Sequence, residues 1–320
     1  MTNSKIDNIE IKQITEDIIL VHQKNPPFYF SCCDGIIILP KKRRNNSTIV
    51  LDLNVEPHLI DKLDDIYGPV KNYICSHGHM DHIAHVHQWE TIGAKIHAPF
   101  PEHANLLDLR NFYQGFGFFE EIDFSVINKF AKKNGYKECQ EVTPFKPGHI
   151  FKFEDLIIET IPLLGHSKAH VGFLIPEERL FHISCLGFDK IRPEKDGFGP
   201  WYGFKECSIE QYLIDITQAE LIFLERANFL TSSHSYIVKS PDKTPFIYMS
   251  EKIAKNQELV DKAIKAHNLT NKSKDTINYL LNLDIFFPKR KMEDYLLEIY
   301  NFWESGIIRK HVERSEYFKE

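Results

Sequence analysis

Short apolar runs separated by turn residues fill the first part of the chain and predict β-strands. These runs lie at residues 18–21, 35–39 and 48–52. Residues 57–67 instead carry their apolar side chains at helical spacing, and residues 70–75 form another strand-sized apolar run. The strand–helix–strand order predicts an α/β fold in which sheets and helices form layers.

The middle and the end of the chain differ in pattern from this first part. Residues 97–150 are rich in Phe and Tyr and are interpreted as an insertion that packs internally or caps a cleft. A helix is predicted over 209–219. Further strand-like runs occur at 156–161, 171–175, 180–183 and 221–224. After about residue 245 a lysine-rich helical periodicity dominates, so we expect a main domain over 1–245 and a small helical, winged-helix-like module over 246–320.

Composition removes several classes of function. The net charge is −6 with histidines neutral, which argues against a nucleic-acid partner, and the basic run Lys41–Arg44 is typical of a solvated hairpin tip. No apolar stretch approaches the roughly 20 residues that a membrane span needs, and the first ten residues do not resemble a signal peptide. The six cysteines show no regular spacing and are typical of reduced thiols, so we expect a cytoplasmic protein.

Histidine is the unusual residue in the composition. The chain has 16 histidines against 15 glycines, and seven of the histidines fall within residues 77–103, where even spacing would place roughly one. The densest part is Ser76-His77-Gly78-His79-Met80-Asp81-His82, directly after the strand predicted over 70–75. This clustering points to chemistry rather than to packing.

Three imidazoles and a carboxylate within six residues are ligand types suited to zinc. On a helix His77 and His79 would point apart, so the motif must form a loop around a metal ion. Gly78 permits the tight backbone that lets its neighbours converge. The alternative is a solvated polar loop that binds no metal ion.

The HxHxDH motif after a strand resembles the signature of the metallo-β-lactamase-fold superfamily, and the resemblance covers roughly residues 10–240. Val50-Leu51-Asp52 resembles the early strand that ends in a structural Asp. Leu164-Gly165-His166-Ser167 and Ser232-Ser233-His234-Ser235 resemble the later metal motifs of this superfamily. The resemblance implies an αββα sandwich with a metal centre at one edge between two sheets. It implies a first site of His77, His79 and His166, and a second of Asp81, His82 and His234.

One position departs from the pattern of the superfamily. Most members carry an Asp that bridges two metals after the strand equivalent to 180–183, whereas this chain reads Ser184-Cys185-Leu186-Gly187. We align Cys185 with that Asp, with Ser184 and Asp189 as alternatives. A thiolate is a good zinc ligand and resembles the second site of some β-lactamases of this fold. The other interpretation is that Cys185 is a small buried hydrophobe and that one metal binds alone.

Several neighbouring residues have simpler interpretations. His85 and His87 are expected to be exposed or to support the ligands, and His182 to lie in the core. His170 is expected to be structural, with contact to a metal ligand as the alternative. Residues 198–203 form a turn with packed aromatics; in the functional alternative, Trp201 or Tyr202 faces the metals and Tyr202 hydrogen-bonds the carbonyl oxygen of a substrate.

These features predict a hydrolase that uses one or two Zn²⁺ ions, with iron or manganese as alternatives. A metal-bound hydroxide would attack a lactone, a thioester or a β-lactam-like bond of a small substrate, and Asp81 would orient the nucleophile and carry its proton. The competing hypotheses are a phosphodiesterase or nuclease of the same fold, a mononuclear iron dioxygenase, and a degenerate site in a binding module. The C-terminal module is similar to additions of some members that cover the active-site edge or form dimers, so a homodimer is one expectation.

Overall fold

The computed structural model describes residues 6–28, 30–40, 47–154, 156–187, 200–234, 237–287 and 292–318. Parts of the sequence discussed above lie outside these ranges: the basic run Lys41–Arg44, the alternative Asp189, residues 198–199 and Ser235.

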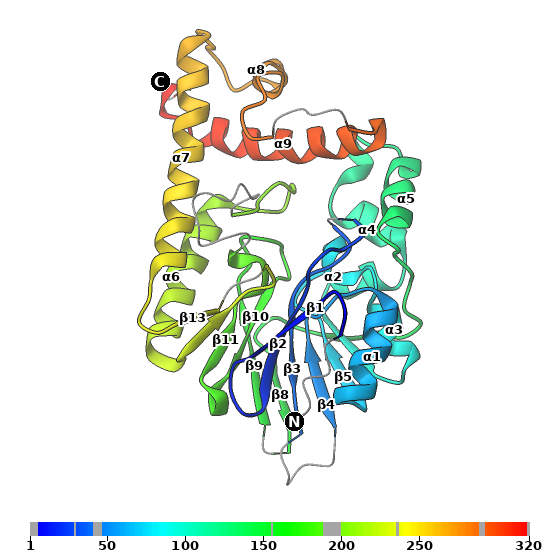
Figure 1. Cartoon of the computed structure of the whole chain (residues 1–320). Coiled ribbons are helices and arrows are strands. Elements are labelled where there is room, and N and C mark those ends of the chain that lie inside the picture. Colours follow the sequence, from blue (N-terminus) through cyan, green and yellow to red (C-terminus); the bar gives the residue numbers. More distant parts are fainter. Residues whose placement is uncertain are drawn as a thin grey trace.

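Two sheets face each other and form the centre of the molecule (Figure 1). The seven strands of the first sheet are, in spatial order, β1 (Ile9–Gln13), β2 (Ile18–Gln23), β3 (Gly35–Ile38), β4 (Thr48–Leu51), β5 (Val70–Ile74), β6 (Lys95–Pro99) and β7 (Thr143–Phe145). The six strands of the second sheet are β13 (Ile237–Lys239), β12 (Phe229–Thr231), β11 (Leu180–His182), β10 (Val171–Ile175), β9 (Leu156–Pro162) and β8 (Ile150–Phe153). The strands from β4 to β7 run parallel, as do β11 and β12, and the other neighbours are antiparallel.

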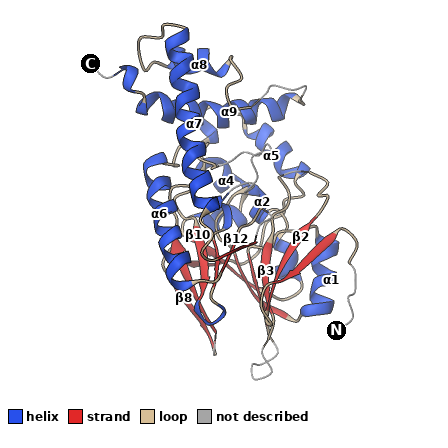
Figure 2. Cartoon of the chain, turned by 60° about the vertical axis from the view of Figure 1, so that its left-hand side comes forward, coloured by secondary structure: helices blue, strands red, loops and turns tan. Residues whose placement is uncertain are grey.

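The helices lie outside the two sheets and at one end of the sandwich (Figures 1 and 2). The α-helices are α1 (Pro57–Tyr67), α2 (Met80–Ile83), α3 (Val86–Thr91), α4 (Leu109–Gly115), α5 (Phe124–Lys133), α6 (Ile209–Arg226), α7 (Thr244–Ala266), α8 (Lys274–Leu281) and α9 (Asp294–Arg314). Short 3₁₀ turns are η1 (Glu102–Leu106), η2 (Phe118–Glu120), η3 (Pro176–Glu178), η4 (Ser184–Gly187) and η5 (Glu316–Phe318). None of the helices in these described ranges is long and apolar enough to cross a membrane.

Burial on both faces explains why the strands appear in the sequence as continuous apolar runs. In β2, Ile18 and Leu20 join a hydrophobic cluster between the two sheets, while Ile19 and Val21 join the cluster under the helices. Successive side chains of a strand point to opposite faces, so a strand covered on both sides needs apolar residues at every position. The predicted layering of sheets and helices is therefore confirmed.

One predicted strand is wrong. Residues 221–224 belong to α6, which continues to Arg226. Its buried positions Tyr212, Ile216, Ala219 and Phe223 recur every three or four residues, whereas Leu221 is exposed. A short apolar run cannot separate strand from helix by itself, and here the longer helical register prevailed. The strand at this point of the chain is β12, a few residues later.

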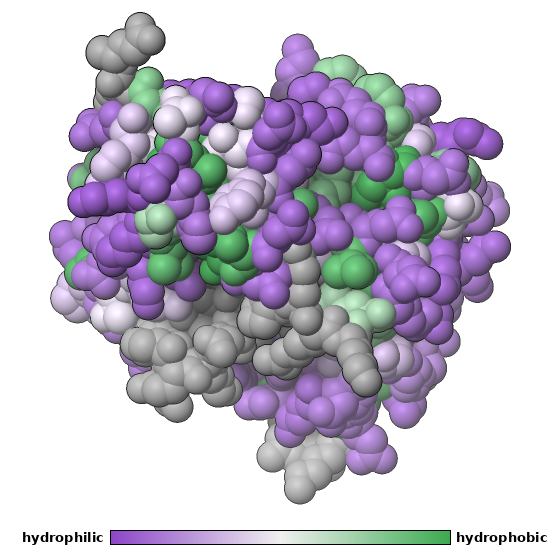
Figure 3. Space-filling view, turned by 90° about the horizontal axis from the view of Figure 1, so that it is seen from above, coloured by the Kyte–Doolittle hydropathy of each residue, from purple (hydrophilic) through white to green (hydrophobic). Residues whose placement is uncertain are grey.

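The aromatic-rich segment 97–150 folds mainly into helices between β6 and β7, and the last part of the chain is helical from Thr244 onward. Helices α7, α8 and α9 share a small core of their own, which includes Val260, Leu280 and Ile308. Helices α7 and α9 also join the main core, for example through Met249 and Trp303. The end of the molecule formed by these helices shows mostly hydrophilic residues with small hydrophobic groups between them (Figure 3).

Candidate metal centre

The HxHxDH motif forms a loop between β5 and α2. His77 and His79 precede the helix, and Asp81 and His82 lie in its first turn. A Cβ atom at Gly78 would lie 2.7 Å from Nδ2 of Asn105, closer than real Cβ contacts allow. An added side chain would therefore displace this amide and press on the carbonyl oxygen of Glu102 at 3.0 Å, and the loop brings together imidazoles that a helix would separate.

Three imidazole nitrogens converge to form the first cluster. Nε2 of His166 lies 3.2 Å from Nε2 of His77 and 3.1 Å from Nδ1 of His79. Tetrahedral nitrogen ligands around zinc are about 3.3 Å apart, given zinc–nitrogen bonds of about 2.0–2.1 Å. Burial, and then the neighbouring histidines, hold the pKa of all three imidazoles well below the usual value. They are therefore neutral, the form that ligates metals, and the donor set fits a zinc ion.

A second cluster combines a carboxylate, two imidazoles and a thiol. Sγ of Cys185 lies 2.9 Å from Nε2 of His82 and 3.1 Å from Nε2 of His234. Oδ2 of Asp81 lies 3.5 Å from the first of these nitrogens and 3.7 Å from the second. Sulfur, nitrogen and oxygen donors of this kind also fit zinc. The sulfur lies within 4.8 Å of ligand atoms of His77 and His166 as well, so it stands between the two clusters.

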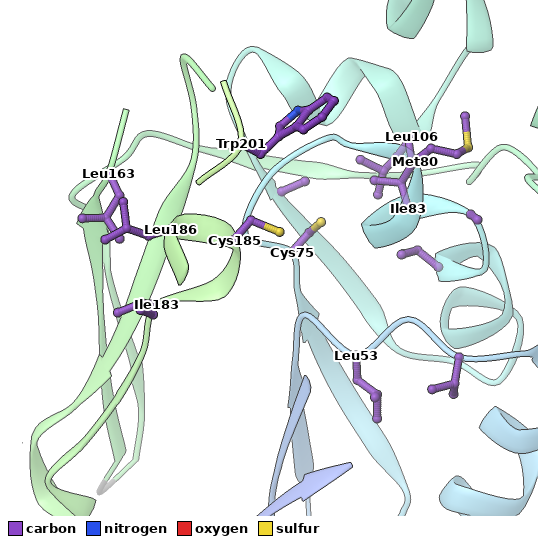
Figure 4. Close-up of a cluster of buried hydrophobic side chains, with 14 of the residues drawn as sticks. Leu53, Cys75, Met80, Ile83, Leu106, Leu163, Ile183, Cys185, Leu186 and Trp201 are labelled. Carbon is purple, nitrogen blue, oxygen red and sulfur yellow. The ribbon is translucent and has the colours of Figure 1, made fainter. Parts of the chain in front are cut away.

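Cys185 reaches this position from η4, which directly follows β11. Figure 4 shows its side chain at the edge between the sheet that carries Ile183 and the strand that leads to Cys75, with Trp201 on the same side. Its neighbour Ser184 points elsewhere and donates a hydrogen bond to Oδ2 of Asp52, at 2.7 Å. Of the alternatives that the structure describes, Cys185 and not Ser184 faces the ligand atoms.

Asp52 lies beneath the second cluster and supports it. Its carboxylate accepts hydrogen bonds from the hydroxyls of Ser76, Ser184 and Ser233, at 2.7, 2.7 and 2.9 Å, and lies 3.0 Å from Nδ1 of His82. Although burial alone would raise its pKa, His82 and these donors hold the pKa well below the usual range. A carboxylate behind a ligating histidine fixes the orientation of the ring. Asp52 itself adopts φ of 57°, a conformation that costs energy in a non-glycine residue.

Two other histidines support the strands and the loop below the ligands. Nδ1 of His170 faces the carbonyl of Leu163 at 2.9 Å, and its Nε2 accepts a hydrogen bond from the backbone amide of Cys185 at 3.2 Å. His170 therefore holds the loop that carries the thiol. This agrees with the alternative given above for His170, in which it contacts a candidate metal ligand. His182 lies in the core, as predicted, with Nε2 3.1 Å from Oγ of Ser233.

His85 and His87 are both buried and lie outside both clusters. The expectation of exposure is wrong for both, because α3 packs these rings inward. In particular, His85 Cε1 would lie only 2.8 Å from a Cβ atom at Gly135.

Glu102 is a supporting residue that the sequence did not reveal. One carboxylate oxygen accepts a hydrogen bond from the amide of Gly78 at 2.7 Å, and the other accepts from the amide of Ala169 at 3.0 Å. The side chain therefore joins the loop of His77 and His79 to the loop of His166. An acidic residue in a helical insertion carries no signal of this role, because the contact depends on how the insertion folds back.

The structure does not bring the hydroxyl of Tyr202 to the metal centre. The side chain is fully buried; its hydroxyl lies 2.9 Å from Nε2 of His311 in α9 and accepts a hydrogen bond from Asn256 in α7 at 2.8 Å. The role in binding a substrate oxygen is therefore a misassignment. The C-terminal helices supply polar partners on the opposite side of the loop, which the sequence of the loop cannot show.

An aromatic pocket opens beside the clusters. Its floor includes His79, Met80 and Asp81. Its walls are Phe30, Phe112, Phe130, Trp201, Phe204 and Trp303. The cavity between these side chains has a volume of about 40 Å³. The walls come from the N-terminal part, the insertion, the 200–204 loop and α9, and no lysine or arginine lines the pocket among the described residues.

Comparisons with known proteins place this geometry in a known fold. No protein-family model and no curated protein matches the chain significantly. Among solved structures, it is similar to a metallo-beta-lactamase family protein from Thermus thermophilus, with a TM-score of 0.57, 15% identity and 89% of each chain covered. It is also similar to the metallo-beta-lactamase FIM-1 from Pseudomonas aeruginosa in its mono-zinc form, with a TM-score of 0.51, 15% identity, and 76% of this chain and 93% of that chain covered.

A third similar structure is a metallo-beta-lactamase from Pontibacter korlensis, with a TM-score of 0.51, 12% identity, and 77% of this chain and 97% of that chain covered. Identities this low show the fold and not the activity. The chain therefore has the metallo-β-lactamase fold, the αββα sandwich that the HxHxDH motif predicted, and it holds candidate metal ligands at one edge of the two sheets.

Proposed function

We propose that this protein is a zinc-dependent hydrolase of a small acyl substrate that carries an apolar group and no negative charge. The observation that supports this most is the juxtaposition of two ligand clusters with an aromatic pocket that has no cationic side chain among its described lining residues. A first metal ion would be held by His77, His79 and His166, and a second by Asp81, His82, Cys185 and His234.

Zinc bound at such a site supplies a Lewis acid that polarises an acyl oxygen and lowers the pKa of a coordinated water. The residues of the chain do the rest. Asp81 belongs to the second cluster and also lines the pocket, and its carboxylate would orient a nucleophilic water and accept its proton. His82 is held by Asp52, so one edge of the second cluster is oriented before a substrate arrives.

The pocket favours one kind of substrate. Phe204 and Trp303 present aromatic rings beside His79 and Asp81, and such walls bind an alkyl or aryl group while excluding water. No lysine or arginine among the described lining residues would pair with a phosphodiester or a carboxylate, so an anionic group that lies away from the bound metal would be buried without a cationic partner, which is costly. A neutral lactone, ester or thioester thus fits better than a nucleic acid or a β-lactam with its carboxylate.

The test begins with metal content, measured by mass spectrometry on protein purified without chelators. The purified protein is then offered a neutral lactone, an aryl ester, a thioester, a β-lactam and bis-p-nitrophenyl phosphate. We expect zinc in the protein and hydrolysis of the neutral acyl substrates, and we expect His77→Ala to lose the hydrolysis and to bind less zinc. Activity and metal content unchanged in His77→Ala would overturn the proposal. Hydrolysis of the phosphodiester alone, or bound iron with thiol-dependent oxygen uptake, would replace it with one of the competing functions.

A further inference from the structure

Helix α9 contacts the loop of residues 200–204, and this loop contacts a predicted metal ligand. We propose that the C-terminal helices support the metal centre by positioning His166 through this loop. The inference rests on the metal binding in the proposed function, and it gives Tyr202 the role of a positioning residue. It concerns how the site is held, not which substrate it takes.

The contact to His166 is made by the nitrogen that faces away from the cluster. Nδ1 of His166 lies 3.0 Å from the backbone carbonyl of Trp201, while Nε2 faces His77 and His79. A carbonyl oxygen can only accept, so Nδ1 carries the proton and Nε2 keeps its lone pair for a metal. The position of the Trp201 carbonyl therefore sets both the tautomer and the orientation of this ring.

A buried polar network holds the next residue of the loop. Nδ1 of His311 lies 2.8 Å from Oε1 of Gln257, whose Nε2 donates to the carbonyl of His311 at 3.0 Å. Nδ1 of His311 is then the donor, and its Nε2 accepts the hydroxyl proton of Tyr202 at 2.9 Å. Asn256 donates to the same hydroxyl at 2.8 Å. Burial lowers the pKa of His311 to about 3, which keeps its ring neutral as this pattern requires.

Backbone contacts tie the remainder of the loop to the same face of α9. Nζ of Lys310 donates to the carbonyl of Phe204 at 2.6 Å. A Cβ atom at Gly306 would lie 2.0 Å from the carbonyl oxygen of Gly203, so only glycine fits there. The ring of Trp303 meets that of Trp201 edge to face at 5.2 Å.

The four contact positions in α9 are 303, 306, 310 and 311, which share one face of a helix. Apolar packing alone tolerates small shifts of a helix along a loop, whereas buried hydrogen bonds with fixed donors and acceptors are satisfied in one arrangement. The network around Tyr202 therefore specifies the register of α9 against the loop. Through the Trp201 carbonyl, the same register specifies the position of His166. Trp303, on this face, also becomes a wall of the pocket.

The experiment compares two tyrosines of the same chain. Tyr202→Phe removes the hydroxyl from the network, and Tyr279→Phe removes the hydroxyl from an exposed tyrosine–histidine pair elsewhere in the C-terminal helices, where Tyr279 lies 2.8 Å from Nδ1 of His267. Zinc affinity is measured by chelator competition, and the cobalt-substituted proteins are compared by their visible absorption. We expect Tyr202→Phe to weaken zinc binding roughly 10- to 100-fold and to change the cobalt spectrum. Tyr279→Phe should leave both at the wild-type values.

Gly306→Ala pushes α9 away from the loop and should act in the same direction as Tyr202→Phe, provided that circular dichroism shows it to be folded. Wild-type zinc affinity and cobalt spectrum in a folded Tyr202→Phe would overturn the inference, whatever its thermal stability. Reduced zinc affinity in Tyr202→Phe without any hydrolytic activity in the wild type would uphold the inference while the proposed hydrolase fails. A wild type that binds no zinc would overturn both.

Discussion

The two ligand clusters lie side by side at one edge of the sandwich, yet they differ in donors and in support. The first consists of the imidazoles of His77, His79 and His166, in which Nε2 of His166 lies 3.2 Å from Nε2 of His77 and 3.1 Å from Nδ1 of His79. The second mixes a carboxylate, imidazoles and the thiol of Cys185. Zinc accepts both sets of donors, but sulfur is the softer donor, and the thiol must lose its proton before it binds the metal.

The supports differ as much as the donors. The first cluster is held in part by segments far from the strand ends, namely Glu102 in the insertion and the loop of Trp201 against α9. At a strand end, the hydroxyl of Ser76 also lies 2.8 Å from Nδ1 of His77. The second is held by hydroxyls at strand ends around Asp52 and by the contact of His170 with the Cys185 amide. The strand-end network thus reaches both clusters, whereas the first cluster depends in addition on the segments added to the sandwich. Changes that act on one cluster and spare the other test this division.

The largest effect is expected from removing a ligand of one cluster at a time. His166→Ala should weaken the first metal by roughly 100-fold or more, since each ligand contributes several kcal/mol to a zinc site. It should leave the thiolate-to-cobalt charge-transfer band of the Cys185 cluster in place. His234→Ala is the matched control and should alter that band while sparing the first metal. Loss of both metals in each variant would show that the clusters act as one unit.

Asp52→Asn should affect the second cluster more than the first. The amide keeps the size of the side chain but loses the charge that holds His82, so we expect the second metal to bind roughly 10- to 100-fold more weakly. The free energy of unfolding should fall by roughly 1–3 kcal/mol, because buried hydroxyls lose an acceptor. Cobalt titration and chemical denaturation measure the two effects. Equal weakening of both metals would contradict the assignment of Asp52 to the second cluster.

Cys185→Asp tests whether the thiol occupies the position of a bridging carboxylate. Because its sulfur lies between the clusters, an aspartate there could contact both metals, so we expect the second metal to bind more tightly and the metal content of the purified protein to rise towards two ions per chain. Cys185→Ser keeps the size without a strong ligand and is the control, expected to hold the first metal only. Unchanged metal content in Cys185→Asp would argue that Cys185 is a packing residue.

Glu102→Gln is expected to have the smallest effect and to act on the first cluster alone. A glutamine can accept from only one of the amides of Gly78 and Ala169 and presents N–H groups to the other. We expect roughly tenfold weaker binding of the first metal, seen by chelator competition, and an unchanged thiolate band. A weakened second metal would mean that the insertion supports both clusters.

Local spacing predicted a metal-binding loop, and the resemblance that its motif carries implied the fold and the remaining candidate ligands. Three imidazoles and a carboxylate in six residues after a strand restrict the backbone to a metal-binding loop, and two later histidine motifs follow in the order of the resemblance. The strands were also readable, because burial on both faces demands uninterrupted apolar runs. The strand predicted at 221–224 was wrong, because a short apolar run within a helix has the same pattern as a strand that is buried on both faces.

What holds the ligands depended on contacts between residues far apart in the chain. The hydroxyl of Tyr202 looked free to meet a substrate until α7 and α9 supplied Asn256 and His311 as its partners, which follow it by 54 and 109 positions. No sequence pattern marked Glu102 as a residue that supports the ligand loops. Ligand identity is determined locally, because the chemistry of a side chain and its spacing are properties of the sequence. Ligand orientation depends on tertiary structure as well. Nδ1 of His77 contacts its sequence neighbour Ser76, but the groups that face Nδ1 of His82 and of His166 arrive only when distant segments pack together.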